Sequence, residues 1–168
     1  MITSPFRIKI SESLQPVEHL ARGAKVIYNN PYNSFYKAGG DSTLTDGVCG
    51  TWNNNDRRWQ GFIRDIDLVV DLGRECEVSS VELSFLQIIG PEIFLPVAVS
   101  VAPTNRADTP EVKVSYTQLI DSTLADVPFV VRPYKLELEP QTKTRYLQII
   151  ARHTPRRGWL FLDEVVVR

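Results

Sequence analysis

Short runs of alternating or continuous apolar residues recur along most of this chain, and Gly, Pro, Asn and Asp separate them. Such runs predict β-strands, because side chains along a strand alternate between two faces. We expect strands at residues 65–72, 78–86, 97–101, 113–119, 129–131, 134–138, 145–151 and 160–167. In the second of these runs, Val81, Leu83 and Phe85 share one face. The pattern predicts the all-β class and an antiparallel β-sandwich or jelly roll.

The length of 168 residues, 43% of them hydrophobic, fits one globular domain with a short appendage. Residues 6–10 alternate like a strand, and the polar stretch that follows is loosely patterned. We therefore expect residues 1–21 to be a linker or the end of a preceding domain, and residues 22–168 to form the domain. Residues 11–21 and 116–126 each have room for a helical turn, but neither has a long amphipathic stripe.

Composition excludes several functions. Nineteen basic and twenty acidic residues give a net charge of -1, so we expect no nucleic-acid partner. No apolar run reaches the roughly 18 to 20 residues needed to cross a bilayer, and residues 1–16 lack a signal-peptide pattern. We expect no membrane insertion. Cys49 and Cys76 allow either one disulfide or two thiols.

A catalytic constellation is not evident in the sequence. The two histidines, His19 and His153, lie in no nucleophile or metalloprotease motif. Asp163 and Glu164 are adjacent in a predicted strand, so they should point to opposite faces, with one of them inward. A pair so arranged cannot flank a glycosidic bond as acid and base. We therefore expect a chain that is not an enzyme.

The loop at residues 36–51 is rich in oxygen-bearing side chains and glycine, a composition that suits a hard cation. The Asp46 carboxylate, the Thr51 hydroxyl, backbone carbonyls and a distant acid such as Glu164 would make most of a calcium shell. The alternative is a plain Asx turn at residues 46–47.

Aromatic and polar residues also mix in two places. Trp52 and Trp59 bracket the run Asn-Asn-Asn-Asp-Arg-Arg, and Arg157 precedes Gly158 and Trp159. Aromatic rings pack on the apolar face of a pyranose, while amide and guanidinium groups bind paired hydroxyls. The mixture indicates a sugar-binding edge; otherwise the tryptophans belong to the core or rim and the arginines are solvated.

With these residues in view, the chain resembles the discoidin or coagulation-factor type C superfamily, and within it the family 32 carbohydrate-binding modules. The resemblance runs from about residue 21 to residue 168. It is carried by the sequence at residues 44–47 (Leu-Thr-Asp-Gly), by Thr51, and by the sequences at 71–73 (Asp-Leu-Gly), 145–147 (Arg-Tyr-Leu) and 163–165 (Asp-Glu-Val). More narrowly, the chain is similar to the module C-terminal to chitobiase-like family 20 β-N-acetylhexosaminidases of Bacteroidetes. This likeness is carried by the sequences at residues 36–40 (Tyr-x-Ala-Gly-Gly), 44–47, 59–62 (Trp-x-Gly-Phe), 85–87 (Phe-Leu-Gln) and 93–96 (Ile-x-x-Pro).

The resemblance implies an eight-stranded, galactose-binding-domain-like jelly roll without catalysis. It implies a module that holds a secreted, periplasmic or cell-surface glycosidase, a hexosaminidase, near glycans bearing galactose or N-acetylhexosamine. It also implies a structural Ca²⁺, or Na⁺, that joins the long loop to the last strand. The ligands implied are Thr43, Asp46, Val48, Thr51 and Glu164.

The sequence departs from the family pattern at two places. Glu92 stands where a tryptophan is common, and the turn after the next strand is the longer segment 101–110. The resulting carbohydrate-binding candidates are Tyr36, Trp59, Glu92, Phe94, Arg157 and Trp159. Two alternatives stay open: a structural accessory domain that packs on the parent enzyme's catalytic domain without binding sugar, and a discoidin-type ligand module with a spike at residues 88–89.

Overall fold

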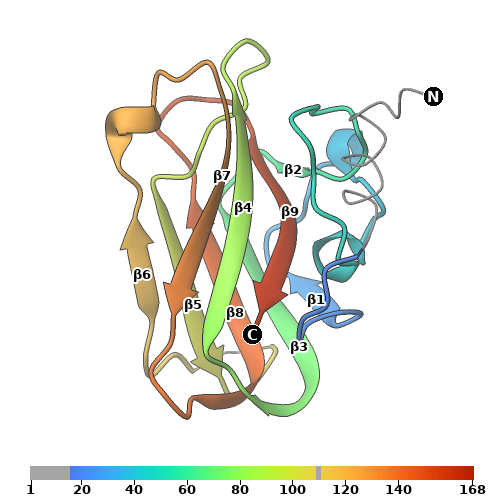
Figure 1. Cartoon of the computed structure of the whole chain (residues 1–168), viewed down its shortest axis with the longest axis vertical. Coiled ribbons are helices and arrows are strands. Elements are labelled where there is room, and N and C mark those ends of the chain that lie inside the picture. The colour runs from blue at the N-terminus through green and yellow to red at the C-terminus, as the bar shows by residue number, and fades with distance from the viewer. Residues whose placement is uncertain (1–15, 109–110) are drawn as a thin grey trace, which may run out of the picture.

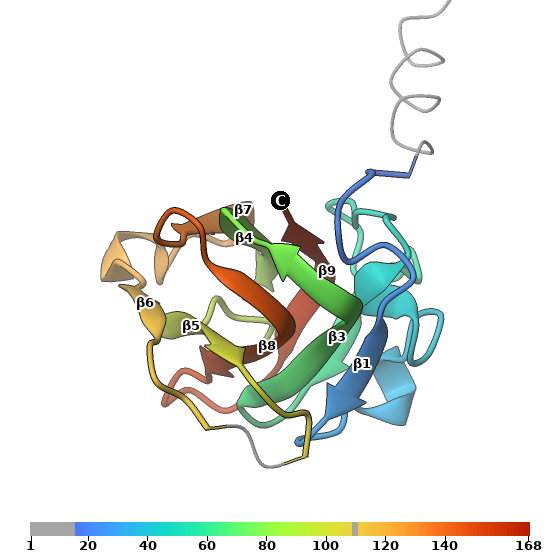
Figure 2. The ribbon, with the colours of Figure 1, turned by 90° about the horizontal axis from the view of Figure 1, so that it is seen from below.

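A computed structural model of the chain, which describes residues 16–108 and 111–168, consists of two stacked antiparallel sheets (Figure 1). The first has the order β1 (Lys25–Tyr28), β3 (Ile66–Glu77), β8 (Lys143–Arg152), β5 (Ala98–Thr104) and β6 (Tyr116–Leu119). The second has the order β2 (Gln60–Phe62), β9 (Leu160–Val167), β4 (Ser80–Ile88) and β7 (Phe129–Glu137). Seen from below, the sheets face each other (Figure 2). The predicted all-β antiparallel sandwich is confirmed.

The core lies between the sheets and follows the alternation read from the sequence. Val81, Leu83 and Phe85 of β4 are fully buried on the inner face, as predicted. On the opposite sheet, alternate residues of β3 and β8 such as Leu68 and Ile149 meet them. Each such side chain contributes about 1.5–3 kcal/mol on burial. This double layer is the rigid frame on which the loops are mounted.

The described residues form nine strands, so the count differs from the expected eight. The additions, β1 and β2, have four and three residues, too few for alternation to be recognised. The two runs predicted at 129–131 and 134–138 are a single strand, β7, which lowers the count by one. Pro133 is tolerated there because β7 is the edge strand of its sheet.

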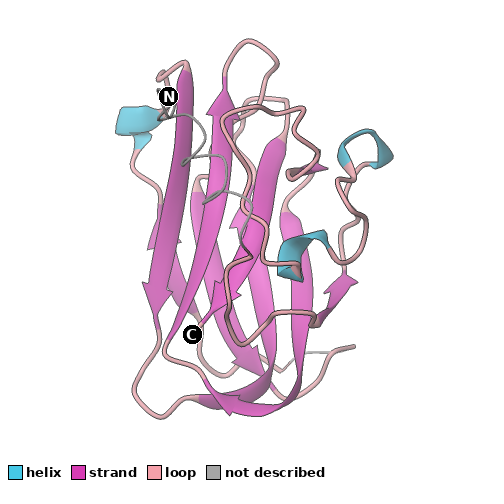
Figure 3. Ribbon diagram, turned by 45° about the vertical axis from the view of Figure 1, so that its right-hand side comes forward, coloured by secondary structure: helices cyan, strands magenta, loops and turns pink. Residues whose placement is uncertain are grey.

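Helical structure in the described residues is limited to three 3-10 turns: η1 (Ser34–Tyr36), η2 (Thr43–Thr45) and η3 (Ser122–Leu124) (Figure 3). The last falls within the segment 116–126, where a helical turn was considered. No helix in the described part of the chain is both long and apolar enough to cross a bilayer. Cys49 and Cys76 are free thiols.

The described part of the N-terminal segment, residues 16–21, lies against the sandwich. The N–H of Val17 donates to the carbonyl of Gly47 (2.8 Å), the N–H of Leu20 donates to that of Val167 (2.8 Å), and Ala21 is fully buried. Residues 1–15, including the strand expected at 6–10, lie outside the described residues. The domain boundary at residue 22 stays a prediction.

Candidate functional site

Two loops meet at the upper end of the sandwich in Figure 1, where β3 begins and β8 ends. The register pairs Ile66 with Ala151, so the residues before β3 lie beside those after β8. Residues 63–65 and 153–159 line a cleft of about 520 Å³ between them. We call this the arginine cleft, because Arg64, Arg156 and Arg157 all line it.

The Asp65 carboxylate joins the two loops of the arginine cleft. Its Oδ1 accepts the backbone N–H of His153 (2.7 Å), and its Oδ2 accepts from the Arg152 guanidinium (3.1 Å). The Asp65 carbonyl in turn accepts from the Asn30 side-chain amide (2.9 Å). Hydrogen bonds to charged groups are worth more than neutral ones, so Asp65 holds the cleft walls at a fixed separation.

The imidazole of His153 holds the loop at residues 154–158 closed. Nδ1 lies 2.8 Å from the Thr154 carbonyl oxygen, and Nε2 lies 2.9 Å from that of Gly158. Each ring nitrogen thus lies within hydrogen-bond distance of a carbonyl oxygen of this loop. His153 therefore stabilises the conformation of this loop.

Trp159 is held by backbone contacts with the neighbouring loop. Its N–H donates to the Glu92 carbonyl (2.8 Å), and its own carbonyl accepts from the N–H of Phe94 (2.9 Å). The preceding Gly158 has φ +149°, and a Cβ at this position would collide with the Glu92 carbonyl oxygen. Only glycine lets the two backbones approach so closely.

An aromatic cluster supports the Trp159 ring. Tyr36 meets Trp159 edge-on at 4.9 Å between ring centroids and meets Phe161 at 4.6 Å. Phe35 lies 5.0 Å from Tyr36 on its other side and is exposed. Edge-to-face pairs at these distances stabilise one ring orientation. Trp159 is half-buried, so part of its ring stays available in the cleft.

The six predicted carbohydrate-binding residues separate into distinct roles. Arg157 and Trp159 line the arginine cleft together. Tyr36 lies behind Trp159 and, with Trp59, also borders a neighbouring cleft of about 630 Å³. Glu92 is exposed but acts on Trp159 through its backbone.

Trp59 and Phe94 are buried, which corrects the expectation of a direct sugar contact for either ring. Trp59 is 1% exposed, and its Nε1 donates to the Thr51 carbonyl (2.8 Å). Phe94 lies beneath the Arg156 guanidinium, 5.6 Å from the ring centroid. A ring whose faces are covered by protein has no face to offer a sugar. Both residues support the loops instead.

Ile63, Arg64 and His153 complete the arginine cleft and were not among the predicted sugar-binding residues. Their signal in the sequence is weak: Arg64 is one charged residue before a strand, and His153 was considered only as a catalytic base. What joins them to Trp159 is the register between β3 and β8. No local sequence pattern contains that register.

A second cluster, which we call the acidic cluster, consists of Asp46, Asp163 and Glu164. In β9, Asp163 and Glu164 both stand opposite Ser84, because the register with β4 shifts between Leu83 and Phe85. This β-bulge places both carboxyl groups on the outer side of the sheet, bordering the same pocket. The expectation that they point to opposite faces is therefore wrong.

Hydrogen bonds tie the acidic cluster to the loop at residues 46–50. Glu164 Oε1 accepts from the N–H of Gly47 (2.9 Å) and from His19 Nε2 (2.8 Å). Asp163 Oδ2 accepts from the N–H of Gly50 (2.7 Å). His19 Nδ1 accepts the N–H of Ala21 (3.2 Å), so the ring is the tautomer that donates from Nε2.

Burial controls the protonation of this cluster. Desolvation raises the pKa of Asp163 to about 8, although two backbone N–H groups bond to its carboxylate. Desolvation also raises the pKa of Glu164 and of Asp46. Burial and the neighbouring carboxylates raise the pKa of the Cys49 thiol to about 11, so the thiol is protonated at neutral pH.

The predicted cation ligands fit the structure in part. Asp46 and Glu164 interact through their carboxyl groups, and Glu164 Oε2 is buried without a hydrogen-bond partner. An oxygen in that position suits a hard cation. The Thr51 hydroxyl, however, donates to Asp56 Oδ2 (2.7 Å). The Thr43 carbonyl accepts weakly from the N–H of Asp46 (3.4 Å), and Val48 contributes its N–H to Asp46 Oδ1 (2.7 Å). Within the described residues no group of three or more His, Cys, Asp or Glu side chains is placed to hold a metal.

Comparison with known proteins finds solved structures that share the fold. No protein-family model matches the sequence, and no curated protein matches it. Solved structures match at low sequence identity. Chitosan-binding module 1 of the chitosanase/glucanase from Paenibacillus sp. IK-5 has a TM-score of 0.60 and 14% identity, covering 90% of this chain and 99% of that one.

Two further structures match equally well. The lectin domain of lectinolysin, complexed with Lewis B antigen, has a TM-score of 0.60 and 17% identity, covering 92% of this chain and 98% of that one. A fucose-binding module from Streptococcus pneumoniae has a TM-score of 0.59 and 16% identity, covering 90% and 98%. The chain shares the β-sandwich fold of these three structures.

Proposed function

We propose that this chain is a non-catalytic carbohydrate-binding module and that the arginine cleft is its glycan site. One observation carries the proposal: the Trp159 ring and the guanidinium groups of Arg64 and Arg157 border one cleft whose walls are fixed by Asp65 and His153. The structures that share the fold and bind chitosan, Lewis B antigen and fucose support it. Fold alone does not determine function, so the proposal depends on the residues that line the cleft.

The cleft has the chemistry that a sugar requires. The exposed part of Trp159 and the exposed Ile63 side chain offer apolar surface to the C–H face of a pyranose. The guanidinium groups of Arg64 and Arg157 donate to hydroxyls in a fixed fork. A site this open buries few groups, so we expect a free energy of binding of about 4 to 6 kcal/mol, a millimolar to high-micromolar affinity.

The finer assignment rests on the resemblance at sequence level. We propose that the module targets a secreted glycosidase, a family 20 β-N-acetylhexosaminidase, to glycans that bear galactose or N-acetylhexosamine. Weak binding by one module suits this role, because tethering raises the effective concentration of the enzyme at its substrate.

A glycan panel tests the proposal. The isolated domain, Trp159→Ala and Trp52→Ala are compared against neutral and charged glycans at millimolar concentration. Trp52 is exposed on another loop and serves as the matched control. We expect binding by the domain and by Trp52→Ala, and loss of binding in Trp159→Ala. Arg157→Ala repeats the test with a residue that lies on the surface. A panel without any specific ligand contradicts the proposal.

For the acidic cluster we propose a structural Ca²⁺, or Na⁺, held by Asp46 and Glu164 with carbonyls of the loop. When bound, the ion would neutralise the charge of the buried Glu164 carboxylate and the half-buried Asp46 carboxylate. A ligand that binds only the folded state raises its stability, by about 2.7 kcal/mol at one hundred times its dissociation constant. We therefore expect millimolar Ca²⁺ to raise the melting temperature of the domain and not that of Asp46→Asn. Equal melting temperatures with and without Ca²⁺ contradict the cation.

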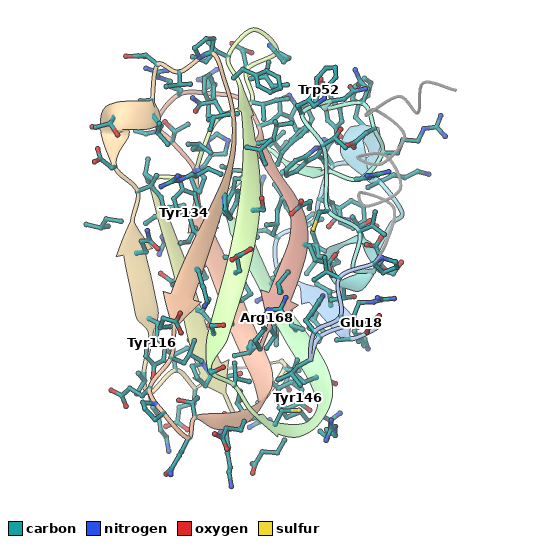
Figure 4. The ribbon with its side chains drawn as sticks, viewed as in Figure 1. Glu18, Trp52, Tyr116, Tyr134, Tyr146 and Arg168 are labelled. Atoms are coloured by element: carbon teal, nitrogen blue, oxygen red, sulfur yellow. The ribbon has the colours of Figure 1, made fainter. Side chains whose placement is uncertain are left out.

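A second candidate function is a structural accessory domain that packs on the parent enzyme. Trp52 and Phe129 meet at 6.4 Å between ring centroids and are 69% and 43% exposed, with Val131 at 37% beside Phe129 on β7 (Figure 4 labels Trp52). Neighbouring exposed apolar groups of this kind mark contact surfaces. This function predicts that Trp52→Ser leaves the isolated domain intact but lowers the stability of the full-length glycosidase. An unchanged full-length enzyme argues against it.

A further inference from the structure

We infer that the arginine cleft binds a glycan that carries an anionic group, a carboxylate or a sulfate. The inference rests on the proposed function and sharpens its ligand class. Three arginines line the cleft against one aspartate, although the chain as a whole has a net charge of -1. Positive charge gathered in a cleft of a nearly neutral protein favours an anionic ligand.

The hydrogen bonds at this end show which of these charges are already neutralised. Asp65 pairs with Arg152, and Asp126 pairs with Arg156 (2.8 Å). Arg64 and Arg157 have no acidic partner in the described residues. Two exposed guanidinium groups thus remain in one cleft. Each presents a planar fork that matches the two oxygens of a carboxylate or sulfate.

A cleft at the opposite end of the sandwich provides an internal comparison. It has a volume of about 650 Å³ and lies around Tyr116 and Tyr146, which Figure 4 labels at the lower end. Its lining holds Glu75, Glu111 and Glu139 against Lys113, Lys143 and Arg145. The charges there balance, so a cleft of this size with aromatic residues in its lining does not by itself carry the excess of positive charge found in the arginine cleft.

Both arginines lie in loops that the protein already holds in place. Arg64 precedes Asp65, which fixes the first loop, and Arg157 lies in the loop that His153 closes. Both loops are therefore organised before a ligand arrives, which lowers the entropy cost of binding. Trp159 and Ile63 in the same lining leave room for the apolar face of the ring.

Calorimetric titration with matched glycans tests this inference. Lactose is compared with 3′-sialyllactose, which adds a carboxylate, and with 3′-sulfated lactose, which adds a sulfate. Galactan and galacturonan oligosaccharides of equal length form a second carboxylate pair. We expect at least one anionic member to bind about tenfold more tightly than its neutral partner, the contribution of one charge-assisted pair. The two arms distinguish carboxylate from sulfate.

Variants locate the effect. Arg64→Ala and Arg157→Ala should each remove most of the anionic preference, and Arg157→Lys should keep only part of it because the fork is lost. Arg74→Ala, an exposed arginine on β3, should change nothing. Raising NaCl from 50 to 500 mM should weaken the anionic ligands and not the neutral ones. Neutral and anionic partners that bind equally overturn the inference and leave the proposed function standing. A domain that binds neither member of any pair overturns both.

Discussion

The acidic cluster and the arginine cleft differ in how far the protein satisfies their charged groups. In the acidic cluster, three of the four carboxylate oxygens of Asp163 and Glu164 accept hydrogen bonds from the protein, and both side chains are buried. In the arginine cleft, Asp65 and His153 are engaged by the protein, whereas Arg64 and Arg157 are exposed and lack an acidic partner within residues 16–108 and 111–168.

The difference separates groups that hold the fold from groups that are free to bind. Buried charges are costly unless the protein satisfies them, so the acidic cluster is expected to control stability. Exposed charges without partners contribute little to stability and keep their hydrogen-bonding capacity for a ligand. Substitutions of the acidic cluster should therefore change stability, whereas substitutions of Arg64 and Arg157 should change ligand binding.

The largest expected effect on stability is that of Glu164→Ala. It leaves the N–H of Gly47 and the Nε2–H of His19 buried without an acceptor. We expect the free energy of unfolding to fall by about 3 kcal/mol, measured by urea denaturation. Glu77→Ala, an exposed glutamate at the end of β3, should change it by less than about 0.5 kcal/mol. Equal losses in the two variants would remove the distinction between the regions.

Gly158→Ala tests whether backbone geometry holds the arginine cleft. The added Cβ meets the Glu92 carbonyl, and the backbone has a φ that only glycine adopts readily. We expect about 2 kcal/mol of destabilisation together with loss of glycan binding. The matched control is Gly73→Ala, where φ is +79° and no atom lies within 4 Å of the added Cβ. It should cost about 1 kcal/mol and leave glycan binding unchanged; binding retained by Gly158→Ala contradicts the account.

The pH dependence of stability tests the environment of Asp163. The folded-state pKa of Asp163 is raised to about 8 from an ordinary value of 3.8, so folding favours the protonated carboxyl group. Its stabilising contribution is complete below about pH 4 and is lost as the pH rises through about 8. Between pH 5 and pH 8 we therefore expect the free energy of unfolding of the wild type to fall relative to that of Asp163→Asn. Parallel stability curves for the two proteins would contradict the raised pKa.

The sequence predicts the sandwich well because its long strands alternate. The inner face of β4 and the extent of β9 follow from Val81, Leu83 and Phe85 and from the run at 160–167. The short strands β1 and β2 carry no such pattern. The β-bulge at Asp163 is likewise invisible to a period of two, and it reverses the predicted orientation of one carboxyl group.

The candidate site is predictable in part for the same reason. Arg157 and Trp159 flank Gly158 in one short run of the sequence, and both line the cleft. Arg64 and His153 reach the cleft only because β3 pairs with β8, a contact between residues nearly ninety positions apart. Trp59 and Phe94 look suitable in composition, but packing buries them. Burial of a single tryptophan depends on the whole fold.

The central claim is that the arginine cleft is the glycan site, and backbone amide shifts of the isotopically labelled domain test it most directly. The domain is titrated with 3′-sialyllactose, 3′-sulfated lactose and N-acetylgalactosamine. The account predicts saturable shifts that cluster at residues 63–65 and 153–159, including the Trp159 side chain, while Gly47 and Gly50 beside the acidic cluster stay unchanged. Saturable shifts confined to another surface, or no shift with any of these glycans, would contradict it.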